Sequence, residues 1–84
     1  MATVEQRVVN VTAKVLGLEP GRIKLTDSFS ADLGAESVQS IELVANFERE
    51  FGIEMDEEQA LSVDSVGAAI EFITQVCKQQ GVAI

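Results

Sequence analysis

The apolar residues of this chain recur at intervals of three and four, and this spacing limits what the chain can fold into. The clearest run lies in the last third, at Val66, Ala69, Ile70, Ile73, Val76 and Cys77. A similar run opens the chain, at Val4, Val8, Val11, Val15 and Leu18. No segment alternates apolar and polar residues as a half-buried strand would. The sequence therefore predicts an all-α fold.

Capping residues and glycines divide this pattern into separate helices. Thr3 and Gln6 have the spacing of a capping box at the start of the first helix, which ends at Gly17. A second helix is predicted from about residue 37 to residue 51, with Gly52 as its C-terminal break.

Two further helices follow. Asp56 and Gln59 have capping-box spacing for a short third helix, and Ser65 can cap the last one. We expect a four-helix bundle of three longer helices and one short third helix, with a long loop between helices 1 and 2. Apolar residues spaced along that loop indicate that it is pinned across the core: Leu18, Ile23, Leu25, Phe29 and Leu33.

Composition excludes several classes of function. The 84 residues contain 14 Asp and Glu against 6 Lys and Arg, a net charge of −8, which disfavours binding to nucleic acid or to an anionic membrane. The absence of histidine excludes histidine-dependent triads and histidine-ligated metals within this chain. The single Cys77 cannot form an internal disulfide, and no signal peptide or membrane span is apparent. We expect one domain over residues 1–84, monomeric, cytoplasmic and without a metal site.

The acidity is concentrated in one part of the chain. Residues 32–58 contain nine acidic side chains and one base, Arg49, so that this stretch carries the whole net charge. Such a stretch is either a solvated face that keeps a small protein soluble or a docking surface for basic partners.

The second helix has apolar residues on two sides. At about 100° per residue, one side gathers the expected core positions Leu43, Val44, Phe47 and Phe51. The opposite side carries Val38, Ile41 and Ala45, bordered by Glu42, Glu48 and Arg49. Either the long loop covers this second side or its residues are scattered surface residues, or it is an exposed patch ringed by carboxylates, as on a transient protein-binding surface.

Ser37 stands at the start of this helix, after a turn that contains Gly34. It is either an ordinary N-cap or a site of modification, because the first-turn amides and the helix dipole favour a phosphate esterified there. Without histidine the chain cannot activate this hydroxyl, so another enzyme would have to modify it.

The run Asp32-Leu33-Gly34-Ala35-Glu36-Ser37-Val38, followed by Ile41-Glu42-Leu43, resembles the prosthetic-group attachment motif of acyl carrier proteins. The resemblance extends from the first helix to Ile73. It implies that a Mg²⁺-dependent phosphopantetheinyl transferase attaches 4′-phosphopantetheine from coenzyme A to Ser37, and that acyl groups are held on its thiol as thioesters. It also implies an acyl cavity at Leu43 and Phe47. The implied partner-binding residues are Glu36, Val38, Ile41, Glu42, Ala45 and Glu48.

The sequence departs from the usual motif at five positions. Glu36 stands where the family has Asp, and Val38 stands where Leu is usual. Ala45 stands where Met is common, Phe47 where Leu is more usual, and Arg49 where the residue is usually acidic. These departures suggest a specialised carrier, not an enzyme, for fatty-acid or related lipid or polyketide biosynthesis. Its partners would be acyl-processing enzymes with basic docking surfaces. The alternative is an acidic helical adaptor without a prosthetic group. A calcium-binding function is not supported, because the segment Asp56-Glu57-Glu58 lacks the alternating Asp and Asn ligands of the twelve-residue calcium loop.

Overall fold

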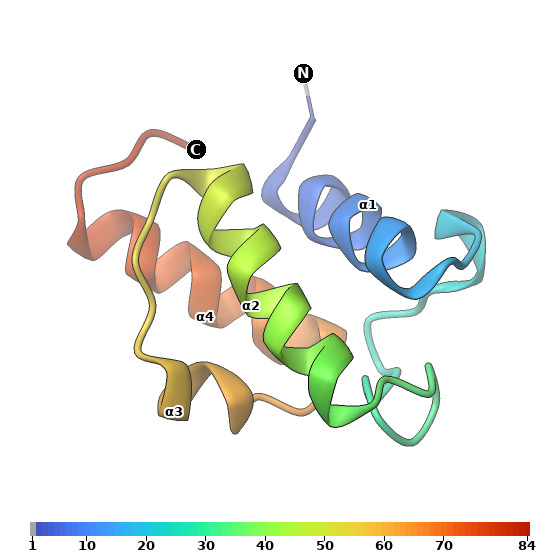
Figure 1. Cartoon of the computed structure of the whole chain (residues 1–84). Coiled ribbons are helices and arrows are strands. Elements are labelled where there is room, and N and C mark those ends of the chain that lie inside the picture. The colour runs from blue at the N-terminus through green and yellow to red at the C-terminus, as the bar shows by residue number, and fades with distance from the viewer. Residues whose placement is uncertain (1) are drawn as a thin grey trace.

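The computed structural model describes residues 2–84 and consists of four α-helices (Figure 1). Only Met1, the first residue of the expected domain, lies outside the described residues. The helices are α1 (Val4–Leu16), α2 (Ser37–Phe51), α3 (Glu57–Leu61) and α4 (Val66–Gln79), and a single 3₁₀ turn, η1 (Pro20–Arg22), lies between α1 and α2. The prediction of a four-helix all-α fold with a short third helix is confirmed.

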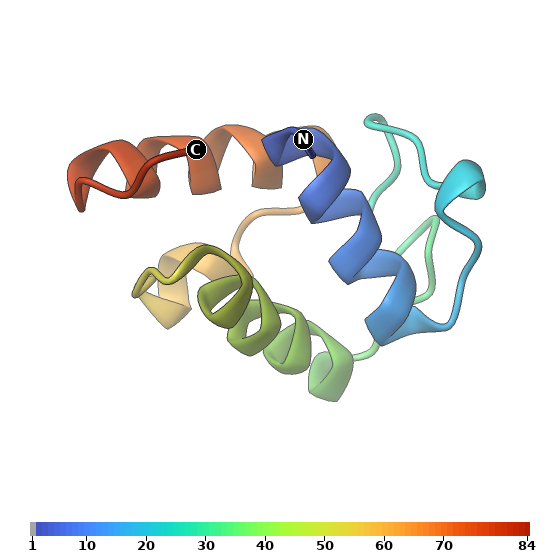
Figure 2. The same ribbon diagram turned by 90° about the horizontal axis from the view of Figure 1, so that it is seen from above.

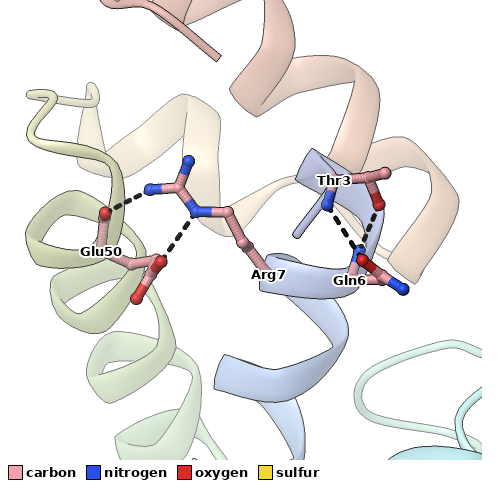
Figure 3. A network of polar contacts seen from close by, with 4 residues as sticks. All are labelled: Thr3, Gln6, Arg7 and Glu50. Carbon is pink, nitrogen blue, oxygen red and sulfur yellow. Dashed lines mark hydrogen bonds and ion pairs between the residues drawn. The ribbon is translucent and has the colours of Figure 1, made fainter. Parts of the chain in front are cut away.

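The helix ends follow the capping residues of the sequence. The Gln6 amide N–H donates to Thr3 Oγ1 at 3.1 Å and the Thr3 amide donates to Gln6 Oε1 at 3.0 Å, which completes the predicted capping box (Figure 3). Asp56 and Ser65 cap α3 and α4 through their side chains. Gly52 ends α2 with a φ of 66°, a left-handed conformation that glycine adopts without steric cost.

The core lies where α1, α2 and α4 meet. In Figures 1 and 2, α1 and α2 run side by side, α4 crosses α1 and passes behind α2 in the view of Figure 1, and the short α3 lies next to α2. The core side chains that are least exposed include Val8, Leu43, Phe51, Val66 and Ile73. Cys77 is also fully buried, and this burial raises the pKa of its thiol above the ordinary value.

The long loop between α1 and α2 is fastened to the core by apolar side chains and a set of backbone bonds. Ile23 and Phe29 are buried, as the apolar spacing predicted. The side chain of Leu25 is 45% exposed, so its expected place in the core is wrong. Leu25 acts through its backbone instead, because its carbonyl accepts a hydrogen bond from the Gly67 amide at 2.9 Å.

Further backbone bonds join the same two segments. The Phe29 amide donates to the Asp64 carbonyl at 2.9 Å, and the Val66 amide donates to the Asp27 carbonyl at 3.0 Å. The loop is therefore held against the start of α4, and this contact fixes the path by which the chain enters α2.

Candidate functional site

Ser37 is the first residue of α2, and its side chain is exposed. The chain reaches it through Gly34, whose φ is 73°, and through the buried Ala35. The Ala35 amide donates to the Phe29 carbonyl at 2.7 Å. Because Phe29 is itself buried and bonded to Asp64, the approach to Ser37 is fixed on the protein while the hydroxyl faces solvent.

The interpretation of Ser37 as the N-cap is wrong, because Glu36 occupies that position. The Glu36 amide donates to Gln39 Oε1 at 3.0 Å, and its carbonyl accepts the first helical bond, from the Ser40 amide at 2.9 Å. No residue from 2 to 84 forms a hydrogen bond with the Ser37 hydroxyl. This oxygen is thus both accessible and unused by the fold, and a phosphate ester on it would lie at the positive end of a 15-residue helix.

The second apolar side of α2 faces solvent. Val38 is 66% exposed and Ile41 is 50% exposed, and Glu42 and Ala45 are exposed beside them. The interpretation in which the long loop covers this side is therefore wrong. Together with Glu36, these residues form a small apolar strip with carboxylates at its margin, beginning next to Ser37.

Glu48 differs from the other carboxylates predicted on this face. Its side chain is half-buried, and Glu48 Oε2 accepts a hydrogen bond from the Met55 amide at 2.9 Å. This bond fastens the segment after α2 back onto the helix. One carboxylate oxygen of Glu48 therefore stabilises the fold. No local sequence pattern predicts this hydrogen bond.

A small cavity lies between α2, α3 and α4. Its volume is about 50 Å³, and Leu43 and Phe47 both line it. Its other apolar lining residues are Phe29, Val44, Met55, Ala60, Leu61, Val63, Ala69, Phe72 and Ile73. A space of this size holds a few water molecules. The rings of Phe29, Phe47 and Phe72 form part of its wall, so these rings would have to move for the cavity to become longer.

Of this lining, only Leu43 and Phe47 were predicted as cavity residues, although Val44 and Phe29 were expected in the core. Ser40 lies on the same side of α2 as Leu43 and Phe47 and could have been found by continuing the helical spacing. Met55 and Val63 come from loops, where no periodic signal exists.

Two other features of the described residues bear on function. Within residues 2–84, the structure brings no three acidic or cysteine side chains together in an arrangement that could hold a metal ion. None of the helices in this range has both the length and the apolar content needed to cross a membrane.

Comparison with known proteins agrees with this geometry. The family model described as "Phosphopantetheine attachment site" matches residues 6–84. Curated acyl carrier proteins from two strains of Porphyromonas gingivalis are each 37% identical over 78 residues, which is 93% of this chain and 100% of those proteins.

A solved structure shows the same fold. The solution structure of the apo doublet acyl carrier protein from prodigiosin biosynthesis superposes with a TM-score of 0.76 over 86% of this chain, at 22% identity. This chain spans 35% of the length of that protein.

Proposed function

Since this chain belongs to the acyl carrier protein family, whose members carry a phosphopantetheine arm, we propose that Ser37 is the residue to which the arm is attached here. The observation that carries this proposal is the exposed hydroxyl of Ser37, which is free of internal hydrogen bonds and lies at the start of α2. The 4′-phosphopantetheine supplies a terminal thiol, on which acyl groups are held as thioesters.

The residues around Ser37 support this role. The unpaired amides of the first turn of α2 favour the negative charge of a phosphodiester at residue 37. The bond from the Ala35 amide to Phe29 holds the approaching backbone, so the ester would project from a defined point. Glu36 caps the helix in place of Ser37, which leaves the serine hydroxyl available to a transferase.

We propose that Glu36, Val38, Ile41, Glu42, Ala45 and Glu48 form the surface on which partner enzymes dock. The apolar strip supplies contact area and the carboxylates attract basic partners, which gives rapid association that salt weakens. These partners would be a phosphopantetheinyl transferase and acyl-processing enzymes. The chain would act as a monomer and would not itself catalyse a reaction.

Leu43 and Phe47 would shelter the first part of an acyl chain in the cavity between α2, α3 and α4. Because the aromatic walls leave about 50 Å³, a short acyl group fits this space better than a long one. The acyl groups that it carries would belong to fatty-acid biosynthesis or to a related specialised lipid or polyketide pathway. A cytoplasmic location is consistent with the unpaired Cys77.

Intact-mass measurement tests the attachment site. The purified protein is incubated with coenzyme A, Mg²⁺ and a broad-specificity phosphopantetheinyl transferase. We expect the mass to rise by one phosphopantetheinyl group, and Ser37→Ala to abolish the rise. Ser40→Ala is a matched control on the same helix and should still be loaded. An adduct that persists in Ser37→Ala would refute the assignment, and no adduct on the native chain would favour an acidic adaptor.

A further inference from the structure

Positive charge gathers in one groove of this acidic protein, between α1 and α2. Three of its six basic residues line the groove, Arg7 and Lys14 from α1 and Arg49 from α2. The remaining lining residues are Ala2, Asn10, Val11, Asn46 and Glu50, so that only one carboxylate faces the three cations. The groove has a volume of about 440 Å³ and opens to solvent.

The three cations differ in how they are held. The Arg7 Nε donates to Glu50 Oε2 at 2.8 Å (Figure 3). Its guanidinium also lies 4.2 Å from the centre of the Phe51 ring, so Arg7 forms a fixed wall of the groove. Lys14 and Arg49 are exposed, and neither forms an ion pair with any residue from 2 to 84. Their charges therefore remain available to an external anion.

The groove borders the docking surface proposed above. Arg49 lies four residues after Ala45 and eleven after Val38, a spacing that places all three on one side of α2. Arg49 is thus shared between the exposed side of α2 and the groove. A partner that covers the apolar strip and extends toward the C-terminal end of α2 reaches the groove next.

We infer that this groove receives an acidic segment of a partner protein, and that it sets the register of that partner along α2. The identification of the partner as an acyl-processing enzyme rests on the proposed function. Carboxylates at Glu36 and Glu42 attract basic groups near Ser37, whereas the exposed Lys14 and Arg49 attract acidic groups further along. A partner with basic residues at both ends would be repelled at the groove, so the charge pattern discriminates between partners.

The dimensions of the groove favour a peptide segment over a single small anion. Arg7 and Lys14 are seven residues apart on α1, which is a rise of about 10 Å. That length matches about three residues of extended chain.

The test uses the full chain, labelled with ¹⁵N, and octaglutamate as the probe at low ionic strength. We expect the amide shifts to concentrate at Asn10, Lys14, Asn46 and Arg49 and to disappear as salt is added. Lys14→Glu and Arg49→Glu should each weaken binding roughly fivefold, as for the loss of one exposed ion pair. Arg22→Glu makes the same change in net charge outside the groove and should have little effect.

Binding of octaglutamate and loading of Ser37 are measured independently, so the failure of one can be told from the failure of the other. Shifts spread evenly over Arg22, Lys24 and Lys78, or an Arg22→Glu variant that loses as much affinity as Lys14→Glu, would overturn the inference even if Ser37 is loaded normally. Absence of any shift on the wild-type chain would also overturn it. Failure of Ser37 to load, with the groove still binding octaglutamate, would refute the proposed carrier site alone.

Discussion

Arg7 of α1 binds Glu50 of α2 at two points, with its Nε 2.8 Å from Glu50 Oε2 and its Nη2 2.7 Å from the Glu50 carbonyl oxygen (Figure 3). The same guanidinium stacks on the ring of Phe51. One side chain of α1 therefore satisfies a carbonyl in the last turn of α2, pairs with a carboxylate and covers an aromatic core residue.

Replacing this arginine should loosen the packing of α1 against α2. We expect Arg7→Ala to lower the free energy of unfolding by about 1–2 kcal/mol, because a hydrogen bond to a charged group and a cation–π contact are lost together. Arg7→Lys should recover only part of this loss, since an ammonium lacks the planar fork. Urea denaturation measures both variants. Arg22→Ala, at an exposed arginine in η1, is the control and should leave stability nearly unchanged.

The exposed apolar strip on α2 should matter for docking and not for folding. We expect Val38→Ala and Ile41→Ala each to reduce kcat/KM of the transferase about fivefold while changing stability by less than about 0.5 kcal/mol. Leu25→Ala removes a side chain of similar exposure from the long loop and serves as the control. An equal loss of kcat/KM in Leu25→Ala would show that the effect is not specific to the strip.

The ring of Phe47 should limit the length of acyl chain that the protein shelters. We expect Phe47→Leu to enlarge the cavity and to slow hydrolysis of a longer acyl thioester, at a cost of about 1–2 kcal/mol in stability. Phe51→Leu is a matched change on the same helix, at a buried residue that does not line the cavity. Similar protection in both variants would contradict the role assigned to Phe47.

The burial of Cys77 predicts a dependence of stability on pH. Because the pKa of the folded thiol is raised above its unfolded value, the neutral thiol is favoured by the fold. The corresponding stability is present below the unfolded pKa and is lost as the pH rises through the folded pKa. We expect unfolding free energy to fall above about pH 8.5, and to fall less steeply in Cys77→Ala. Identical slopes in the two proteins would contradict this prediction.

Local signals in the sequence predicted the helices well. The capping box at Thr3, the caps at Asp56 and Ser65 and the break at Gly52 all act between neighbouring residues, so their chemistry can be read from short spacings. The position of Ser37 at the start of α2 was predicted for the same reason. The identity of the N-cap residue was not predicted, because serine is preferred over glutamate at N-cap positions. Here the hydrogen bond between the Glu36 amide and Gln39 favours Glu36 as the N-cap.

Long-range contacts could not be predicted in this way. The bonds from residues 25–29 to residues 64–67 join two segments without periodicity, and the contact between Glu48 and Met55 depends on the path of a turn. The groove containing Arg7, Lys14 and Arg49 also required two helices to be placed side by side. Charge counting along the chain revealed the acidic stretch but gave no indication of this basic cluster.

The fastening of the long loop to the start of α4 also has a consequence for synthesis of the protein. The bonds that hold Leu25 and Phe29 are made by Gly67 and Asp64, which lie 42 and 35 residues later in the chain. While the chain is still emerging from the ribosome, the backbone before Ser37 lacks these anchors. The anchored approach to the serine therefore forms only after residues 64–67, at the start of α4, have been synthesised.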